Sequence, residues 1–219
     1  MDPNDYRNTT YCPKFENIDK KKADLKKKII EEDHRTSRNF YELIRDNVDY
    51  KKQYFKIYNY KCAYCGTSIN ILENGLFELD HFKNKANHDD NVNDISNIIL
   101  ACKFCNRQKS SFNVDNIFEL INPDNNEITK IFYRDKDYYI KIREPFSENK
   151  DINDFYNKLK LNYQFRRLDF LLLNLKGLIN KIKNLDFNNK EKIYTILLEL
   201  KNTLQEKRNL IITKEDIQE

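Results

Sequence analysis

Two pairs of cysteines constrain the fold of this chain more than any other feature. Cys62 and Cys65 are separated by two residues, and Cys102 and Cys105 repeat that spacing. Together the pairs offer the four thiolates of a closed, tetrahedral zinc site. Because zinc with four cysteine ligands has no open position, it does not activate water but fixes geometry. We therefore expect a structural zinc ion that clamps two segments and holds the loop between them.

Two other uses of cysteine compete with zinc. A single CxxC pair can be a thioredoxin-like redox centre, but that use leaves the second pair unexplained. Four cysteines also ligate iron–sulfur clusters, and this stays open as the alternative. The fifth cysteine, Cys12, stands apart from both pairs. We expect it to be an inert free thiol.

The composition describes a folded, very polar protein. Charged residues make up 34% of the 219 residues, and 39 basic against 35 acidic side chains give a net charge of +4. Attraction to nucleic acid must therefore come from local patches. The longest apolar run, residues 168–175, is too short to cross a bilayer, and the first residues lack a secretion signal. We expect a cytoplasmic protein, where clustered cysteines bind metal more often than they form disulfides.

The sequence pattern divides the chain into four regions. They are an N-terminal helical region (1–58), a cysteine-bearing module (59–113), a connecting segment (114–150) and a C-terminal helical region (151–219). Within the connecting segment, β-branched and aromatic residues at 128–133 and 138–143 flank a turn, which predicts a β-hairpin. The predicted fold is mainly α with a small α+β core, flanked by N-terminal and C-terminal helices.

The N-terminal region carries a predicted helix start and two lysine runs. Ser37 precedes apolar residues at helical spacing, so we expect it to be an N-cap. Residues 20–22 and 26–28 are all lysine, which indicates either a solvated helix face or a surface for phosphates. The chain has only 3 glycines and no glycine-rich loop. We therefore expect neither a self-sufficient P-loop ATPase nor a dinucleotide enzyme.

The loop between the cysteine pairs carries the candidate chemistry. Residues 75–82, "GLFELDHF", alternate as a strand with Glu78 and Asp80 on one face, and they deliver Asp80 and His81 at the strand end. An Asp-His pair alone is common in structural roles. Asn106 follows the second cysteine pair at the start of a predicted helix. Since one zinc would tether both segments, we expect Asp80, His81 and Asn106 to converge.

This arrangement resembles a known family. A CxxC pair, Asp-His at a strand end and an Asn ahead of "IILACKFCNRQKS" are similar to the zinc-containing HNH endonucleases, over residues 60–113. The resemblance implies a ββα-metal HNH module stapled by the four-cysteine zinc site. The segments "LDHFKNK", "INPDNNEITKIFYRDKDYYIKI" and "LKLNYQFRRLDF" also resemble the HNH subunits of bacterial anti-phage systems. In Septu and some retron loci these subunits act beside an ATPase.

The resemblance implies a role for each polar residue of the module. His81 would be the general base that takes a proton from water, and Asp80 a ligand of a catalytic divalent cation. Asn97 would brace the loop through backbone hydrogen bonds, and Asn106 would be the second cation ligand. An amide and a carboxylate oxygen suit Mg²⁺ or Mn²⁺ rather than zinc or nickel. The products would carry a 5′-phosphate and a 3′-hydroxyl.

Basic side chains crowd the same segments. They offer positive charge for the phosphates of a nucleic acid, although each is also an ordinary solvated residue in the alternative interpretation. The candidates for nucleic-acid contact are Lys83, Lys85, Lys103, Arg107 and Lys109.

The sequence thus predicts a metal-dependent endonuclease that hydrolyses phosphodiester bonds in DNA. By resemblance, it would be an effector of anti-phage defence with an ATPase partner protein. A non-catalytic zinc-ribbon module that binds nucleic acid or protein is the alternative from another class. A third hypothesis is an HNH protein that stays inactive until a partner positions its substrate, which the long helical extensions favour.

Overall fold

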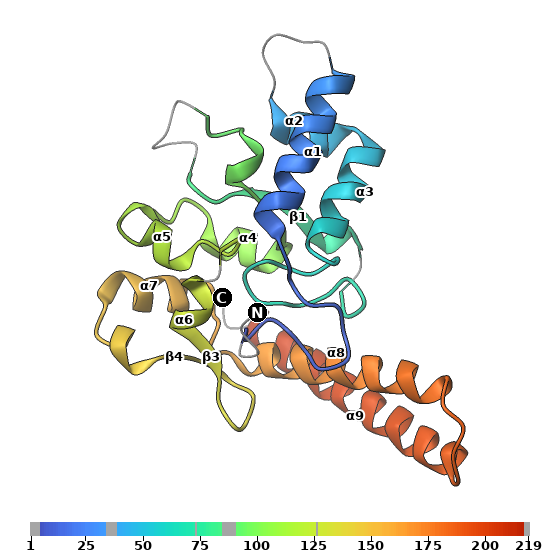
Figure 1. Cartoon of the computed structure of the whole chain (residues 1–219). Helices are drawn as coiled ribbons and strands as arrows, with labels where there is room; N and C mark the ends of the chain where they lie inside the picture. Colours follow the sequence, from blue (N-terminus) through green and yellow to red (C-terminus); the bar gives the residue numbers. More distant parts are fainter. Residues whose placement is uncertain (1–4, 34–38, 73, 85–90, 126, 217–219) are drawn as a thin grey trace.

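The computed structural model describes residues 5–33, 39–72, 74–84, 91–125 and 127–216. Within these ranges, helices surround two antiparallel two-stranded sheets (Figure 1). Short 3₁₀ turns connect the larger elements: η1 (Asn74–Leu76), η3 (Ile95–Asn97), η4 (Asp115–Ile117) and η5 (Glu144–Phe146). This architecture confirms the expected fold, mainly α with a small α+β core.

Three helices form the N-terminal region: α1 (Ile18–Glu32), α2 (Phe40–Asp46) and α3 (Val48–Ile57). The side chain of Asn39 caps α2 by accepting a hydrogen bond from the backbone N–H of Glu42 at 3.2 Å. The cap expected at Ser37 lies outside the described residues, and Asn39 fills that role. An Asn side-chain oxygen satisfies the same exposed N–H groups as a serine hydroxyl.

The lysine runs of α1 are not a uniformly solvated face. Lys22 lies on the buried stripe of the helix, 2% exposed. Its ammonium donates to the backbone carbonyl of Ile98 at 2.9 Å and forms a buried ion pair with Asp124. Lys26 pairs with Asp94 near the surface. Helical periodicity places Lys22 among apolar residues, so this lysine ties α1 to the strand that follows the loop.

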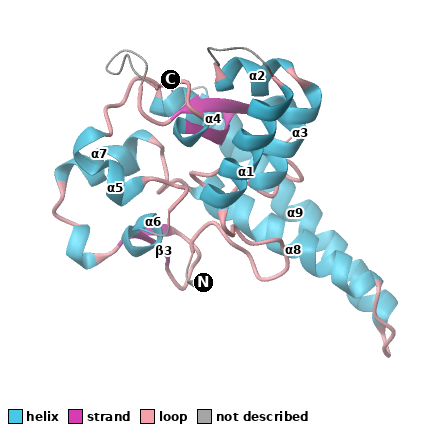
Figure 2. Cartoon of the chain, turned by 45° about the horizontal axis from the view of Figure 1, so that its top comes forward, coloured by secondary structure: helices cyan, strands magenta, loops and turns pink. Residues whose placement is uncertain are grey.

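The centre of the module is a ββα unit. Strand β1 (Phe77–His81) pairs antiparallel with β2 (Ile98–Cys102), and α4 (Lys103–Lys109) follows β2 directly. Figure 2 shows the strands with α4 on one side and α1 to α3 on the other. Every residue of β2 is buried. Along β1, buried and partly exposed side chains alternate as expected, with one exception. Asp80 lies on the polar face but is buried.

The connecting segment differs in part from the predicted hairpin. Residues expected as its first strand begin with a helix, α6 (Glu127–Ile131), and only then form β3 (Phe132–Arg134) against β4 (Ile140–Ile142). Ile128 and Ile131 are both fully buried, one helical turn apart. Burial of this pair overrides the strand preference of β-branched residues. A short helix, α5 (Phe118–Ile121), precedes α6.

The C-terminal region contains α7 (Lys150–Lys158), α8 (Gln164–Lys183) and α9 (Lys190–Asp216). Helices α8 and α9 pair as a hairpin that projects from the rest of the molecule (Figure 1). In the described part of the chain, no helix combines the length and the apolar character that crossing a bilayer requires.

One hydrophobic core joins the N-terminal helices, the module, the connecting segment and α7. The cluster of buried side chains extends from Tyr6 to Leu161 and includes residues of α1, α3, both strands of the module and α7. The cysteine-bearing module is therefore packed against the segments before and after it.

Candidate active site and four-cysteine site

The four cysteines of the two CxxC pairs meet in the structure. Their sulfur atoms all lie within 4.8 Å of one another, and all four residues are buried. A tetrahedral ion with Zn–S bonds of about 2.3 Å separates its ligands by roughly 3.8 Å. The Sγ atoms of Cys65 and Cys102 are 3.9 Å apart. Four thiols at this spacing fit a closed zinc site.

Local backbone geometry explains this convergence. The N–H of Gly66 donates to the carbonyl of Cys62 at 2.9 Å, which closes a tight turn around the first pair. Gly66 has a φ of 76°, and a Cβ there would lie 2.5 Å from the carbonyl oxygen of Arg7, so only glycine fits. Cys102 ends β2 and caps α4, because its Sγ accepts from the N–H of Cys105 at 3.5 Å.

A buried arginine from outside the module contacts the sulfurs. Arg166 of α8 is 2% exposed, and its guanidinium donates to Cys105 Sγ at 3.0 Å and faces Cys102 Sγ at 3.9 Å. Zinc with four thiolates carries two net negative charges, which a buried cation offsets. Arg166 lies 61 residues beyond Cys105, and no local sequence signal indicates this contact.

The polar face of β1 lies against one face of α4. Asn106 donates from Nδ2 to Glu78 Oε2 at 2.7 Å, and Lys109 donates from Nζ to Asp80 Oδ1 at 3.1 Å. Residues three apart share a helix face and residues two apart share a strand face, which accounts for both contacts. Asp80 and Asn106 are thus on facing elements. The residue of β1 that contacts Asn106 directly is Glu78, which the sequence did not single out as a site residue.

Asp80 is held by two donors in a buried position. It is 7% exposed, and its Oδ2 accepts from the hydroxyl of Tyr64 at 2.6 Å while Lys109 contacts Oδ1. Burial raises the pKa of the Asp80 carboxyl, although Lys109 and the Tyr64 hydroxyl both favour the ionised form. Tyr64 lies inside the first CxxC pair, so the four-cysteine site also positions a donor to Asp80.

His81 is oriented from two sides. Its Nε2 is 2.9 Å from Asn93 Oδ1, and its ring stacks on Tyr41 of α2, with centroids 4.4 Å apart and planes 20° apart. The carbonyl of His81 accepts from Lys109 Nζ at 2.8 Å. The contact with Asn93 and the stacking on Tyr41 together fix the plane of the imidazole ring. Neither Tyr41 nor Asn93 was singled out from the sequence.

Asn97 binds the backbone of the loop that follows β1. Its Oδ1 accepts from the N–H of Lys83 at 2.8 Å, and its Nδ2 donates to the carbonyls of Lys83 at 3.1 Å and Val92 at 2.9 Å. The backbone carbonyl of Asn97 also accepts from Phe82 at 2.9 Å. These bonds close the loop near its base, where His81 leaves the strand.

The basic candidates for nucleic-acid contact differ in position. Arg107 is exposed and Lys103 is partly exposed on α4, whereas the ammonium of Lys83 lies 3.9 Å from the ring centre of Phe118. Lys85 lies outside the described residues. Lys109 is only 1% exposed, and its ammonium points inward to Asp80. Lys109 is therefore placed as a partner of Asp80 rather than at the surface.

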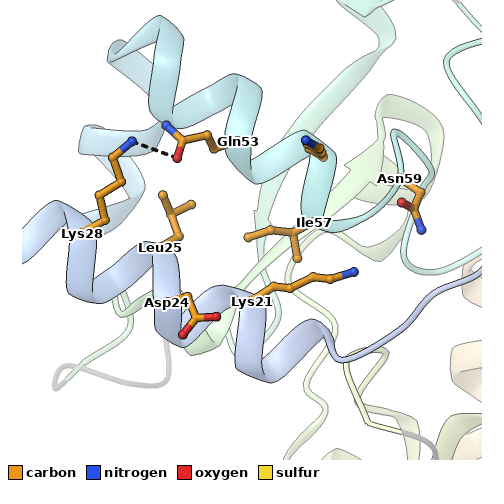
Figure 3. Close-up of a pocket in the computed structure, with 8 residues that line it drawn as sticks. Lys21, Asp24, Leu25, Lys28, Gln53, Ile57 and Asn59 are labelled. Atoms are coloured by element: carbon orange, nitrogen blue, oxygen red, sulfur yellow. Dashed lines mark hydrogen bonds between the residues drawn. The ribbon is translucent and has the colours of Figure 1, made fainter.

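A separate pocket of about 490 Å³ lies between α1 and α3 (Figure 3). Lys21, Lys28 and Lys56 line it together with Asp24, and Lys28 donates to Gln53 Oε1 at 3.1 Å. None of the candidate catalytic residues lines this pocket. A phosphate-contacting role for the lysine runs stays a prediction.

Comparison with known proteins bears on the module. Residues 62–112 match the sequence model of a family described as HNH endonuclease. The chain is 45% identical over 65 residues to YoqL, an SPbeta prophage-derived protein of Bacillus subtilis (strain 168) named provisionally as an HNH endonuclease. This match covers 28% of the chain and 26% of the relative, so the chain spans about a quarter of that protein's length. No solved structure matches the chain at a significant level.

Proposed function

We propose that this chain, whose residues 62–112 match the HNH endonuclease family, hydrolyses phosphodiester bonds in DNA and needs a divalent cation to do so. One observation carries the proposal: the polar face of β1 meets α4 beside His81, through the contacts of Asn106 with Glu78 and of Lys109 with Asp80. These contacts align α4 with the polar face of the strand that ends at His81, which supports a site built from a base and hard oxygen donors.

His81 is the general base of the proposed reaction. The imidazole of His81 accepts a proton from the attacking water, and the contact of its Nε2 with Asn93 Oδ1 at 2.9 Å orients the ring. Stacking on Tyr41 and the bracing of the loop by Asn97 fix the plane and position of the ring. This preorganisation lowers the cost of orienting the base for attack.

Asp80 and Asn106 are the proposed protein ligands of the cation. Their carboxylate and amide oxygens are the donors that Mg²⁺ and Mn²⁺ prefer. A cation bound there would stabilise the charge that develops on the phosphate and the leaving oxygen. Lys103, Arg107 and Lys83 are the proposed contacts to neighbouring phosphates.

The four cysteines hold zinc in this proposal, and the role of that ion is structural. We expect Arg166→Met to weaken zinc binding by about 10- to 100-fold, since partners of metal ligands contribute on this scale. The measurement is zinc release to a competing chromophoric chelator at constant protein concentration. Arg167→Met is the matched control, because Arg167 donates to the carbonyl of Asp137 instead. Equal zinc release by both variants would contradict the role of Arg166.

The direct test of the proposed activity is cleavage of DNA by the purified full chain. Supercoiled plasmid and a linear duplex should be cut when Mg²⁺ or Mn²⁺ is added and left intact when EDTA is present. The zinc content of the protein is measured under both conditions and should be the same. Mobility of the products on a sequencing gel, before and after phosphatase treatment, checks for 5′-phosphate ends. Tight DNA or protein binding with no cleavage under any of these conditions would favour the zinc-ribbon binding module.

The finer biological role rests on resemblance. We propose that the nuclease acts in the cytoplasm as an effector of anti-phage defence, together with a partner protein such as an ATPase. A partner-dependent nuclease is supported by the outer face of α9, where Ile193, Ile196 and Leu200 are exposed. Adding the product of a neighbouring ATPase gene to the cleavage assay tests this role, and the expected result is faster cutting.

A further inference from the structure

Two carboxylates of β1, not one, face α4. Glu78 and Asp80 are two residues apart on the strand, so their side chains emerge on the same side, roughly 7 Å apart along it. Asp80 is buried and both of its oxygens already accept hydrogen bonds, from Tyr64 and Lys109. Glu78 is partly exposed, and its Oε2 accepts from Asn106. The more accessible carboxylate at Asn106 is therefore that of Glu78.

The charges at the proposed cation site favour a second carboxylate ligand. Lys109 forms an ion pair with Asp80, so this pair contributes almost no net charge to the cation site. If the only protein groups at the site were the Asp80–Lys109 ion pair and the neutral Asn106 amide, the positive charge of a divalent cation would be poorly balanced before the substrate phosphate binds. The carboxylate of Glu78 supplies the missing negative charge next to Asn106, where its distance to the amide nitrogen is 2.7 Å.

We propose that Glu78 is a ligand of the catalytic cation. Glu78 and Asn106 hold the cation together, on the face of β1 that also carries Asp80. This inference rests on the proposed nuclease function and extends its cation site by one residue. The hydrogen bond from Asn106 Nδ2 to Glu78 Oε2 also fixes the orientation of the Asn106 amide. The amide oxygen, Asn106 Oδ1, therefore points away from this hydrogen bond and is available as a ligand. Glu78 Oε1 and Asn106 Oδ1 then offer two hard oxygens from facing elements.

A purely positioning role for Glu78 makes a different prediction. Glutamine keeps an oxygen at the same place that still accepts the hydrogen bond from Asn106, but it carries no charge. If Glu78 only orients Asn106, Glu78→Gln leaves cation affinity unchanged. If Glu78 is a ligand, loss of its charge weakens cation binding by tenfold or more, as about 1.4 kcal/mol corresponds to each factor of ten.

The test is titration of the zinc-loaded full chain with Mn²⁺ in the absence of DNA, followed by the electron paramagnetic resonance signal of free Mn²⁺. Glu78→Gln should bind Mn²⁺ at least tenfold more weakly than the unaltered chain. Glu119→Gln is the matched control, because it removes the same charge from the exposed face of α5 and should bind as the unaltered chain does. Zinc content and the melting temperature show that each variant is folded.

The outcomes separate this inference from the proposed function. Unchanged Mn²⁺ affinity in Glu78→Gln overturns the ligand role of Glu78 even if the chain cuts DNA. An equal loss in Glu119→Gln also overturns it, because the effect would then be one of net charge. Failure of the unaltered chain to cut DNA is read in the plasmid assay and counts against the nuclease proposal, independently of the Mn²⁺ titration.

Discussion

Replacement of His81 by alanine is expected to slow cation-dependent DNA cleavage by about 10²- to 10⁴-fold, the range typical of a lost general base. The imidazole contacts Asn93 and Tyr41 at the end of β1 and does not belong to the four-cysteine cluster. Zinc content and melting temperature should therefore stay close to those of the unaltered chain. Single-turnover rates of plasmid nicking at saturating Mg²⁺ give the measurement.

A second readout separates a base from a cation ligand. In the proposed mechanism His81 accepts a proton and does not hold the cation, so His81→Ala should bind Mn²⁺ as tightly as the unaltered chain. Asn106→Ala is the counterpart, with both cleavage and Mn²⁺ affinity reduced. Undiminished cutting by His81→Ala would refute the assignment of the base. Parallel loss of Mn²⁺ binding would instead make His81 a ligand.

The local features of the site could be predicted from the sequence. Ligand chemistry fixes the spacing of a zinc-binding pair, so Cys62, Cys65, Cys102 and Cys105 could be grouped from their spacing alone. Strand alternation placed residues 77–81 in β1 correctly. The helix expected to start at Asn106 is present as α4, but it begins three residues earlier, at Lys103, between the two cysteines of the second pair. Each of these features depends on residues close together in the sequence.

Contacts across long sequence separations could not be predicted in this way. Arg166 reaches the cysteines from α8, and Tyr41 stacks on His81 from α2. The residues next to Arg166 and Tyr41 in the sequence do not reveal these contacts, because any arginine or tyrosine of an amphipathic helix has similar neighbours. Lys109 is an intermediate case: its place three residues after Asn106 puts both on one helix face. The direction of that face toward Asp80 depends on packing alone.

The sequence-based predictions were wrong where burial of side chains determines the structure. The β-branched residues at 128–131 favour a strand by propensity, yet they form α6 because Ile128 and Ile131 fill the core. Lys22 belongs to a run typical of a solvated face but lies on the buried stripe of α1. In both cases the periodicity of apolar neighbours is more informative than the residue type.

The four-cysteine site is linked to the C-terminal hairpin by polar contacts. Cys65 Sγ lies 3.3 Å from Thr67 Oγ1, which donates to Asp169 of α8 at 3.0 Å. Asp169 in turn forms a buried ion pair with Arg208 of α9. Because buried ionic groups are costly when a partner is lost, disturbance of the sulfurs is transmitted to both helices. Zinc is therefore expected to stabilise more than the module that binds it.

Replacement of Cys102 by serine should accordingly lower zinc content and destabilise the fold together. Structural zinc contributes about 10–16 kcal/mol of apparent binding energy in small zinc domains, and that energy is folding energy. Loss of roughly a third of it would reduce the melting temperature by roughly 7 to 20 °C, since 1 kcal/mol shifts the melting temperature of a protein of this size by about 2–4 °C. Metal analysis and thermal unfolding, followed by circular dichroism, give the measurement.

The fifth cysteine offers the control for this experiment. Cys12 lies outside the cluster, and its thiol contacts the carbonyl of Leu173 at 3.5 Å. Cys12→Ser should therefore keep zinc content and the melting temperature, which excludes a general effect of removing a thiol. Proteolysis adds a spatial readout: because Arg208 and Asp169 depend on the sulfur cluster, Cys102→Ser should expose α9 to cleavage earlier than Cys12→Ser does. Full zinc content and unchanged melting in Cys102→Ser would mean that the two CxxC pairs do not form one metal site.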